Sequence, residues 1–452
     1  MSPPPGCPTC WPAADVRRLM RHAEARIVDA TAGLWPDAEA AFGPTVTGGG
    51  AFLRQVRVGG QTLCARIRPA GAALPGVVLG DYGDRAAVLA SDADRADATV
   101  QEAEQLTALA TYSGLRVAAP TATASGVLFT RWVTGPSLAS RLHEHPATLT
   151  GLLTSLLDEL GEVHRDPAEQ LRQVAAPAGV RAHPRIVAQA LARSADHLHP
   201  DSPQSAAADE LRALVGSLSL RLGRLAAQLD LLLVARAGLA FGSLAPRHML
   251  YPDSSARPVL VFPDLGPGGD ITDTGTLLGH LHLLALDSPP TVRTELVDGI
   301  EAWLAGRLAT RGADWRDWLN AVLTIWAASV YDTVVTALTL PAALPLDADT
   351  SRLAARPLPA LEGLKVLTAE LRRRGAGAAL NAIVAALAID PAGHDDRPRL
   401  ISAFPDRTRK APVHGHDATP ATGKPATARP AAVPQASSDI RRLRRPSPPV
   451  GR

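Results

Sequence analysis

The chain has 452 residues, of which 46% are hydrophobic, and a formal net charge of +2 at neutral pH. That length suits two or three ordinary domains or one two-lobed enzyme with a sizeable core. The near-neutral charge and the 4% content of aromatic residues give no strong signal for nucleic acid, which basic surfaces and stacked aromatic rings bind.

Cysteine usage and the apolar stretches predict a cytoplasmic protein that does not span a membrane. Three cysteines without a regular framework are typical of a reducing compartment. The first residues do not follow the pattern of a secretory signal. The most apolar stretch, 225–241, is interrupted by Asp230 and Arg236, so we interpret it as buried helix or strand.

Residues 1–40 are predicted to be an N-terminal extension that holds one helix. Apolar side chains recur at helical spacing over 14–34. Cys7 and Cys10 form only half of a zinc site, because zinc normally takes four ligands and no second pair follows. We interpret the two cysteines as an ordinary pair in an irregular segment.

Residues 41–134 are predicted to form a small, mainly β unit with one helix. Segment 46–69 alternates between apolar and polar residues around two glycine turns, as strands do. Segment 95–114 has helical spacing and ends at a glycine. Segment 126–135 is interpreted as a further strand, closed by a turn.

Residues 135–394 are predicted to be largely helical, with two short strand-like pieces at 239–252 and 259–266. Residues 395–452 are rich in Pro, Ala, Thr and Arg and cannot bury enough apolar surface to fold, so they predict a disordered tail with a basic end. The expected fold class is α+β with two lobes, a small β-rich N-lobe and a larger helical C-lobe.

Five segments in this order resemble the aminoglycoside phosphotransferase and choline kinase family, the small-molecule branch of the protein-kinase-like enzymes. The segments are TGGGAFLRQVRV, LCARIRP, QEAEQLTALATYSGLRVAAPTATASGVLFTRWVTGPSL, LLDELGEVHR, and FGSLAPRHMLYP with the VLVFPDLG that follows it. The resemblance implies a bilobed protein-kinase-like fold and transfer of phosphate from ATP with Mg²⁺.

The resemblance places Arg66 where the family has the lysine that holds the ATP phosphates. Lysine does not occur before Lys365, and the arginine-rich, Ala- and Pro-rich composition suits a GC-rich genome such as an actinobacterial one. Arginine is longer and planar, so the exchange is not conservative. The helix partner would be Glu102, with Glu104 less favoured. The plainer alternative is a solvated strand arginine and a solvated helix glutamate.

The catalytic loop departs from the family pattern at two positions. The family has His-Gly-Asp, whereas this chain has Phe241-Gly242-Ser243, and serine without an activator is a poor base. His248 stands where the family has a magnesium-binding asparagine, and imidazole suits magnesium poorly. His248 is either a displaced general base or a packed loop residue.

Other family positions are retained. Gly48, Gly49 and Gly50 correspond to the nucleotide-binding first turn. Asp264 stands at the position of the family's metal-binding aspartate, although an aspartate before a glycine-containing turn is also common for purely local reasons. Asp273 matches a structural aspartate of the family, and it could equally be a helix N-cap.

Three of the four central residues of the chemistry are exchanged, so the leading hypothesis is a kinase-like protein with a degenerate active site, a pseudokinase. It would bind nucleotide weakly or act as a scaffold for a protein partner. The alternative is an active but unorthodox ATP-dependent phosphotransferase. Its substrate would be a small hydroxylated molecule or Ser/Thr of a natural-product precursor peptide.

Overall fold

The structure is a computed structural model that describes residues 11–69, 73–79, 88, 97–175, 183–195, 198, 205–252, 257–341 and 343–389. All of these belong to one compact unit, Met1–Ile401, and a second unit comprises Ser402–Arg452. Cys7, Cys10 and the basic end of the chain lie outside the described residues, so the expectations about them stay predictions.

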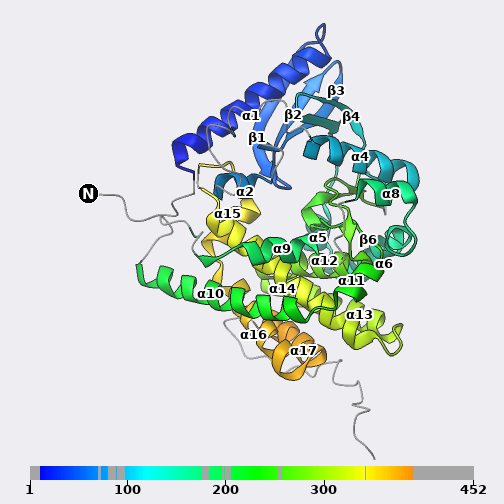
Figure 1. Cartoon of the computed structure of the whole chain (residues 1–452), viewed down its shortest axis with the longest axis vertical. Helices are drawn as coiled ribbons and strands as arrows, with labels where there is room; N and C mark the ends of the chain where they lie inside the picture. Colours follow the sequence, from blue (N-terminus) through cyan, green and yellow to red (C-terminus); the bar gives the residue numbers. More distant parts are fainter. Residues whose placement is uncertain are drawn as a thin grey trace, which may run out of the picture. The chain divides into compact units, whose positions relative to one another are not determined.

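An antiparallel five-stranded sheet forms the N-terminal part (Figure 1). Its strands follow the order β1-β2-β3-β5-β4. Their bounds are β1 (Ala40–Gly48), β2 (Ala51–Val58), β3 (Gln61–Ile67), β4 (Pro120–Ala124) and β5 (Val127–Arg131). Both glycine turns join neighbouring strands, and Gly49, Gly50, Gly59 and Gly60 all have positive φ, as the two-residue turns of hairpins require.

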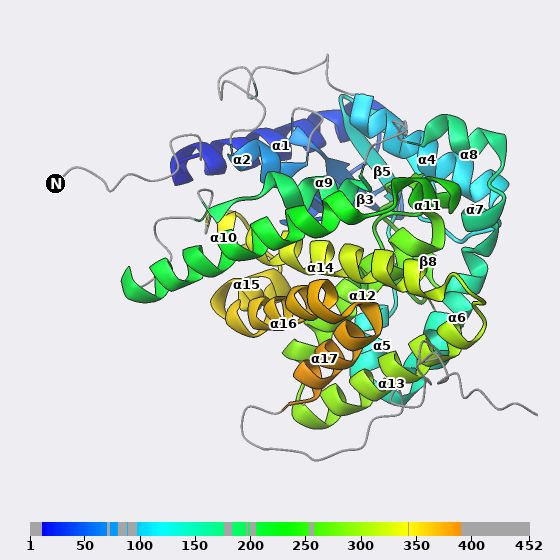
Figure 2. The ribbon, with the colours of Figure 1, turned by 60° about the horizontal axis from the view of Figure 1, so that its bottom comes forward.

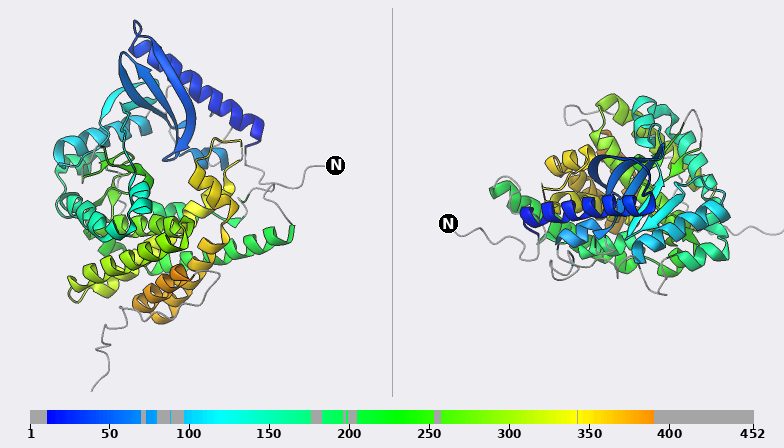
Figure 3. Two further views of the ribbon diagram at one scale, coloured as in Figure 1. Left: turned by 180° about the vertical axis from the view of Figure 1, so that it is seen from behind. Right: turned by 90° about the horizontal axis from the view of Figure 1, so that it is seen from above.

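Helix α1 (Ala13–Leu34) lies along this sheet (Figure 3) and contributes to its core. It buries one stripe of apolar side chains, at helical spacing, in the same core as apolar residues of β2, β3 and β5. The stripe comprises Val16, Leu19, Ala23, Ile27 and Ala30. The helix predicted for the N-terminal extension is therefore confirmed, and it is part of the N-terminal core rather than an appendage.

The remainder of the chain is mostly helical. The helices of the N-terminal half are α2 (Leu74–Leu79), α4 (Asp97–Tyr112), α5 (Leu138–Glu144), α6 (Leu149–Glu159), α7 (Gly161–Arg165), α8 (Glu169–Val174) and α9 (Arg185–Ala192). Those that follow are α10 (Ser205–Gln228), α11 (Leu231–Arg236), α12 (Gly269–Asp287), α13 (Pro290–Ala309), α14 (Trp315–Thr339), α15 (Ala348–Ala355), α16 (Leu358–Arg374) and α17 (Ala376–Ala388).

Helix α14 is the central element of the helical core and packs against α9, α12 and α16 (Figure 2). It approaches α12 most closely at Gly275 and Gly279, where an added Cβ would lie 2.7 Å from side-chain atoms of Ile325 and Ser329. Among the described helices, α14 alone is long and apolar enough to cross a membrane, but 83% of its apolar window is buried inside the protein. Its hydrophobicity is that of a core helix.

The α+β class, with a small sheet followed by a larger helical part, is confirmed. The two strand-like pieces are much shorter than their patterns suggested. They form only two-residue strands, with β6 (Leu239–Ala240) paired to β9 (Gly266–Pro267) and β7 (Met249–Leu250) paired to β8 (Val259–Leu260). Tertiary packing, not strand pairing, therefore accounts for most of their apolar character.

A connection between the two parts runs through the described residues between α14 and α15, which are 340, 341 and 343–347 and are called the 340–347 segment. Leu344 is buried in the N-terminal core although it follows the longest helix of the C-terminal part. The backbone N–H and the hydroxyl of Thr47, at the end of β1, both donate to the carbonyl of Pro345. The 340–347 segment thus ties the helical part to the sheet beside the first glycine turn.

Candidate functional site

The loop that carries Ser243 is held in place by Asp273 of α12. The backbone N–H groups of Phe241 and Gly242 each donate to a carboxylate oxygen of Asp273 at 2.8 Å, and His164 Nε2 lies 2.8 Å from Oδ2. Asp273 is fully buried, and the N-cap of α12 is Gly268. The N-cap interpretation of Asp273 is therefore wrong, because its carboxylate satisfies buried groups of the loop and not those of the helix end.

The same loop packs closely against the segment that contains Asp264. Gly242 has a φ of +89°, and an added Cβ would lie 2.1 Å from the carbonyl oxygen of Asp264. The N–H of Asp264 in turn donates to the carbonyl of Phe241 at 2.8 Å. Ser243 directly follows this contact and is half-buried. Its hydroxyl makes no hydrogen bond to any residue in the described part of the chain.

Arg66 of β3 and Glu102 of α4 form an ion pair inside the protein. Their side chains are 2% and 5% exposed, so the alternative of a solvated arginine and glutamate is wrong. Glu102 also accepts from Nε of Arg68 at 3.1 Å. The less favoured partner, Glu104, is exposed. Burial lowers the pKa of Arg66 to about 9, so its guanidinium remains charged at neutral pH.

Phe262 occupies the space between three of the sequence-predicted residues. The guanidinium of Arg66 lies over its ring at 4.0 Å, and Nη2 of Arg66 donates to the carbonyl of Val261. The ring of His248 meets Phe262 edge-on at 4.5 Å between centroids. An added Cβ on Gly49 would lie 2.9 Å from the ring. A side chain of the protein therefore touches both the glycine turn and the arginine that the resemblance assigned to phosphate.

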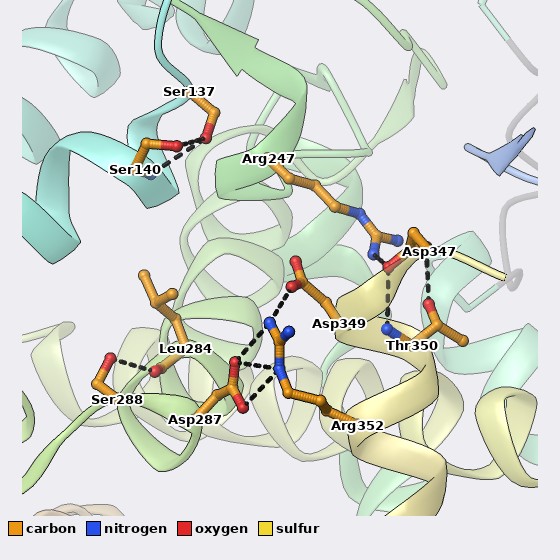
Figure 4. A network of polar contacts seen from close by, with 10 residues as sticks. All are labelled: Ser137, Ser140, Arg247, Leu284, Asp287, Ser288, Asp347, Asp349, Thr350 and Arg352. Carbon is orange, nitrogen blue, oxygen red and sulfur yellow. Dashed lines mark hydrogen bonds and ion pairs between the residues drawn. The ribbon is translucent and has the colours of Figure 1, made fainter.

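His248 is an uncharged imidazole that is hydrogen-bonded to its neighbour Arg247. Its Nε2 accepts from Nε of Arg247 at 3.2 Å, and its Nδ1 is buried without a hydrogen-bond partner among the described residues. Burial, and then the charge of Arg247, hold the pKa of His248 well below its usual value. Arg247 also donates to Asp347, which caps α15 by accepting from the N–H of Thr350 (Figure 4).

Asp264 lies against a guanidinium. Nη1 of Arg185, the first residue of α9, is 2.5 Å from Oδ1 of Asp264. Arg68 is close enough to both groups to interact with their charges. Burial lowers the pKa of Arg68, repulsion from Arg185 lowers it further, and Asp264 raises it. Neither arginine is among the residues that the sequence pointed to, and in the structure Arg185 contacts Asp264 while Arg68 lies near enough to both to interact with their charges.

These residues do not fit a magnesium ion. Magnesium demands an octahedral shell of oxygen ligands. The described part of the chain contains no group of three or more His, Cys, Asp or Glu side chains that could hold a metal ion. In nucleotide sites waters, substrate phosphates and only one or two carboxylates supply the shell, so the fit depends on those few protein ligands. Asp264 already has one oxygen on Arg185, and His248 offers a nitrogen bonded to Arg247 where a neutral oxygen would be needed.

No protein-family model matches the chain, and no curated protein matches it either. Solved structures show partial similarity. An ethanolamine kinase from Plasmodium vivax has 10% identity and a TM-score of 0.42, covering 71% of this chain and 81% of its own. An aminoglycoside phosphotransferase from Streptomyces rimosus has 16% identity and a TM-score of 0.40, covering 69% and 98%.

A spectinomycin phosphotransferase in complex with ADP and spectinomycin has 11% identity and a TM-score of 0.38, covering 81% of this chain and 98% of its own. Each of these three structures is named as a kinase or a phosphotransferase. At such identities the similarity concerns the fold alone and assigns no activity.

Proposed function

We propose that this chain is a kinase-like protein of the aminoglycoside phosphotransferase type whose site does not support efficient phosphoryl transfer, and that it acts by binding a nucleotide or a protein partner. The observation that carries the proposal is the contact between Arg185 and Asp264. It places a positive charge on the carboxylate that would hold the metal, beside a loop with serine at the position of the base.

The position of Ser243 supports the absence of general-base help. A hydroxyl becomes a useful base or nucleophile only with an activating partner. The hydroxyl of Ser243 has no hydrogen-bond partner among the described residues. Loss of a positioned base costs about 10²–10⁴ in rate.

The alternative, an active enzyme with His248 as a displaced base, has less support. A general base must reach the proton that it abstracts and have a pKa near the working pH. The pKa of His248 is held far below that range, its Nε2 accepts from Arg247, and its Nδ1 is buried. These contacts fit the second interpretation of His248, that of a packed loop residue.

The surroundings of Arg66 also favour binding without transfer. Productive phosphoryl transfer depends on precise placement of the γ-phosphoryl group by cations. Arg66 stacks on Phe262 and donates to the carbonyl of Val261, so part of its hydrogen-bonding capacity faces the protein itself. If a nucleotide binds, we infer that it is ATP or ADP held without the alignment that transfer requires.

The proposal is tested by measuring ADP formation from ATP and Mg²⁺ with a panel of acceptors: aminoglycosides, sugars, choline and Ser/Thr peptides. We expect the same background rate for the native chain and for Asp264→Ala. Acceptor-dependent ADP formation that Asp264→Ala abolishes would overturn the proposal. In that case His248→Gln would show whether the imidazole is the base.

A further inference from the structure

The cluster around Asp264 carries an excess of positive charge. Three guanidinium groups, those of Arg66, Arg68 and Arg185, lie with two carboxylates, those of Glu102 and Asp264. Both oxygens of Glu102 are used by Arg66 and Arg68, and Asp264 is used by Arg185. The formal charges of these five described side chains sum to one unbalanced positive charge.

The arginines differ in how far they reach solvent. Arg66 is 2% exposed, with a buried Nε that has no hydrogen-bond partner among the described residues. The side chain of Arg68 is 16% exposed, and that of Arg185 is 53% exposed. Arg185 and Arg68 can therefore contact a ligand from solvent, whereas Arg66 lies behind them as a fixed buried charge.

The first glycine turn lies beside the same cluster. An added Cβ on Gly50 would be 3.5 Å from Nη1 of Arg68, and Gly50 has a φ of +71°. Glycine at this point leaves the turn open to close approach by a ligand and by Arg68. The turn and the two accessible arginines thus converge, although Arg185 comes from α9 and the turn from the first hairpin.

We propose that this cluster is a polyanion site that works without a divalent cation, and that Arg185 with Arg68 neutralises the phosphates of a nucleoside di- or triphosphate in place of magnesium. The inference rests on the proposed function, because it assumes that the phosphates do not have to be aligned for transfer.

The different chemistry of guanidinium and magnesium distinguishes this mode of nucleotide binding from the magnesium-dependent one. A guanidinium is always charged at neutral pH and binds phosphate oxygens through paired N–H donors. A nucleotide that brings its own magnesium would carry that ion toward Arg185, and the like charges would repel. Magnesium should therefore weaken nucleotide binding to this chain instead of strengthening it.

The test is a calorimetric titration of the full chain with AMP, ADP and ATP, once in EDTA and once in excess Mg²⁺. We expect binding in EDTA that tightens from AMP to ATP, and a loss of affinity of at least threefold when Mg²⁺ is added. Arg185→Gln should lose at least tenfold in EDTA. Arg185→Lys keeps the charge but loses the paired donors, so its affinity in EDTA should lie between those of the native chain and Arg185→Gln.

A matched control is Arg373→Gln on α16, since Arg373 is also exposed and also paired to a carboxylate, that of Glu370. This variant should keep the native affinity within twofold. Circular dichroism of every variant checks that it is folded. If Arg185→Gln is not folded, the more conservative Arg185→Lys still tests the inference.

Three outcomes overturn the inference. They are affinity that rises tenfold or more with Mg²⁺, native affinity for ATP in Arg185→Gln, and absence of binding by any of the three nucleotides. The last outcome would leave the proposed function intact, because a scaffold need not bind nucleotide. Acceptor-dependent ADP formation would overturn the proposed function and leave the anion-binding result to stand on the titrations alone.

Discussion

His164 of α7 and Asp273 of α12 meet in the buried interior, with Nε2 and Oδ2 2.8 Å apart. The same carboxylate accepts from the N–H groups of Phe241 and Gly242, so one side chain joins two helices and the loop before Ser243. Such a carboxylate supports the loop whether or not the loop performs chemistry. The support that Asp273 gives to the loop therefore does not depend on which residue stands at position 243.

Replacing Asp273 with alanine should destabilise the protein strongly, because three buried groups would lose their acceptor. Each buried unsatisfied polar group costs about 1–3 kcal/mol, so we expect a loss of about 3 kcal/mol or more. Urea unfolding followed by circular dichroism measures it. Asp209→Ala on α10 is the control, since that carboxylate is 80% exposed and its ion pair should contribute less than about 1 kcal/mol. Equal losses in the two variants would contradict the role given to Asp273.

The 340–347 segment should contribute to stability through its burial in the N-terminal core. Leu344→Ala leaves a cavity there, and such truncations cost about 2–5 kcal/mol. Leu358→Ala, at a leucine that is 52% exposed, should change the free energy of unfolding by less than about 0.5 kcal/mol. If both changes were equally mild, the contact between this segment and the sheet would not persist in solution.

Gly242 and Gly306 should respond to alanine with opposite signs. Gly242 has positive φ and backbone of Asp264 where a Cβ would be, so Gly242→Ala should cost about 2 kcal/mol or more. Gly306 lies inside α13 with nothing within 4 Å of an added Cβ, so Gly306→Ala should stabilise by about 0.5–1 kcal/mol. Thermal unfolding of the two variants beside the native chain distinguishes the signs. A neutral Gly242→Ala would show that the loop can move away from Asp264.

Local features were the part of the structure that sequence patterns predicted well. The alternation between 46 and 69 and the helical spacing over 14–34 each reflect one buried face, so β2, β3 and α1 follow from periodicity. Only the last three residues of β1 (Ala40–Gly48) lie within the alternating segment. The contact of Arg66 with Glu102 was expected from the resemblance and is present. The short helix α15 was not expected, since eight residues give little periodic signal.

Contacts between residues far apart in the chain could not be predicted from local sequence patterns. Arg185 is 79 residues before Asp264 and begins a short helix, so nothing in its local pattern points to that carboxylate. Phe262 could have been noticed as a large aromatic residue two positions before Asp264. The sequence pattern indicates only an apolar strand at Phe262, whereas the structure places its ring in contact with both Arg66 and His248.

Asp332 of α14 should make stability depend on pH. It faces Arg193 at the end of α9, with 3.7 Å between Nε and Oδ1, and burial raises its pKa from 3.8 to about 6 although Arg193 opposes the shift. The folded state holds this proton more tightly than the unfolded state does. The stabilisation of the folded state by protonated Asp332 is therefore fully present below pH 3.8 and is lost as pH rises through 6.

Asp332→Asn mimics the neutral carboxyl, so the free energy of unfolding of the variant relative to the native chain should increase between pH 4 and pH 7. From the size of the shift we expect an increase of about 2 kcal/mol. Urea unfolding of both proteins at several pH values gives the difference directly. A difference that does not vary with pH would mean that Asp332 ionises normally in the folded protein.

The last prediction concerns restoration of a metal site. Ser243→Asp alone should not create magnesium-dependent nucleotide binding, because Arg185 would still occupy Asp264. The double variant Ser243→Asp with Arg185→Gln should create it, since two carboxylates then stand on segments that already touch at Gly242 and the guanidinium is gone. Titration with a non-hydrolysable ATP analogue should show at least tenfold tighter binding in Mg²⁺ than in EDTA for the double variant only. If Ser243→Asp by itself gains that dependence, Arg185 leaves Asp264 readily when a metal binds, and the barrier to catalysis lies in the loop and not in the arginine.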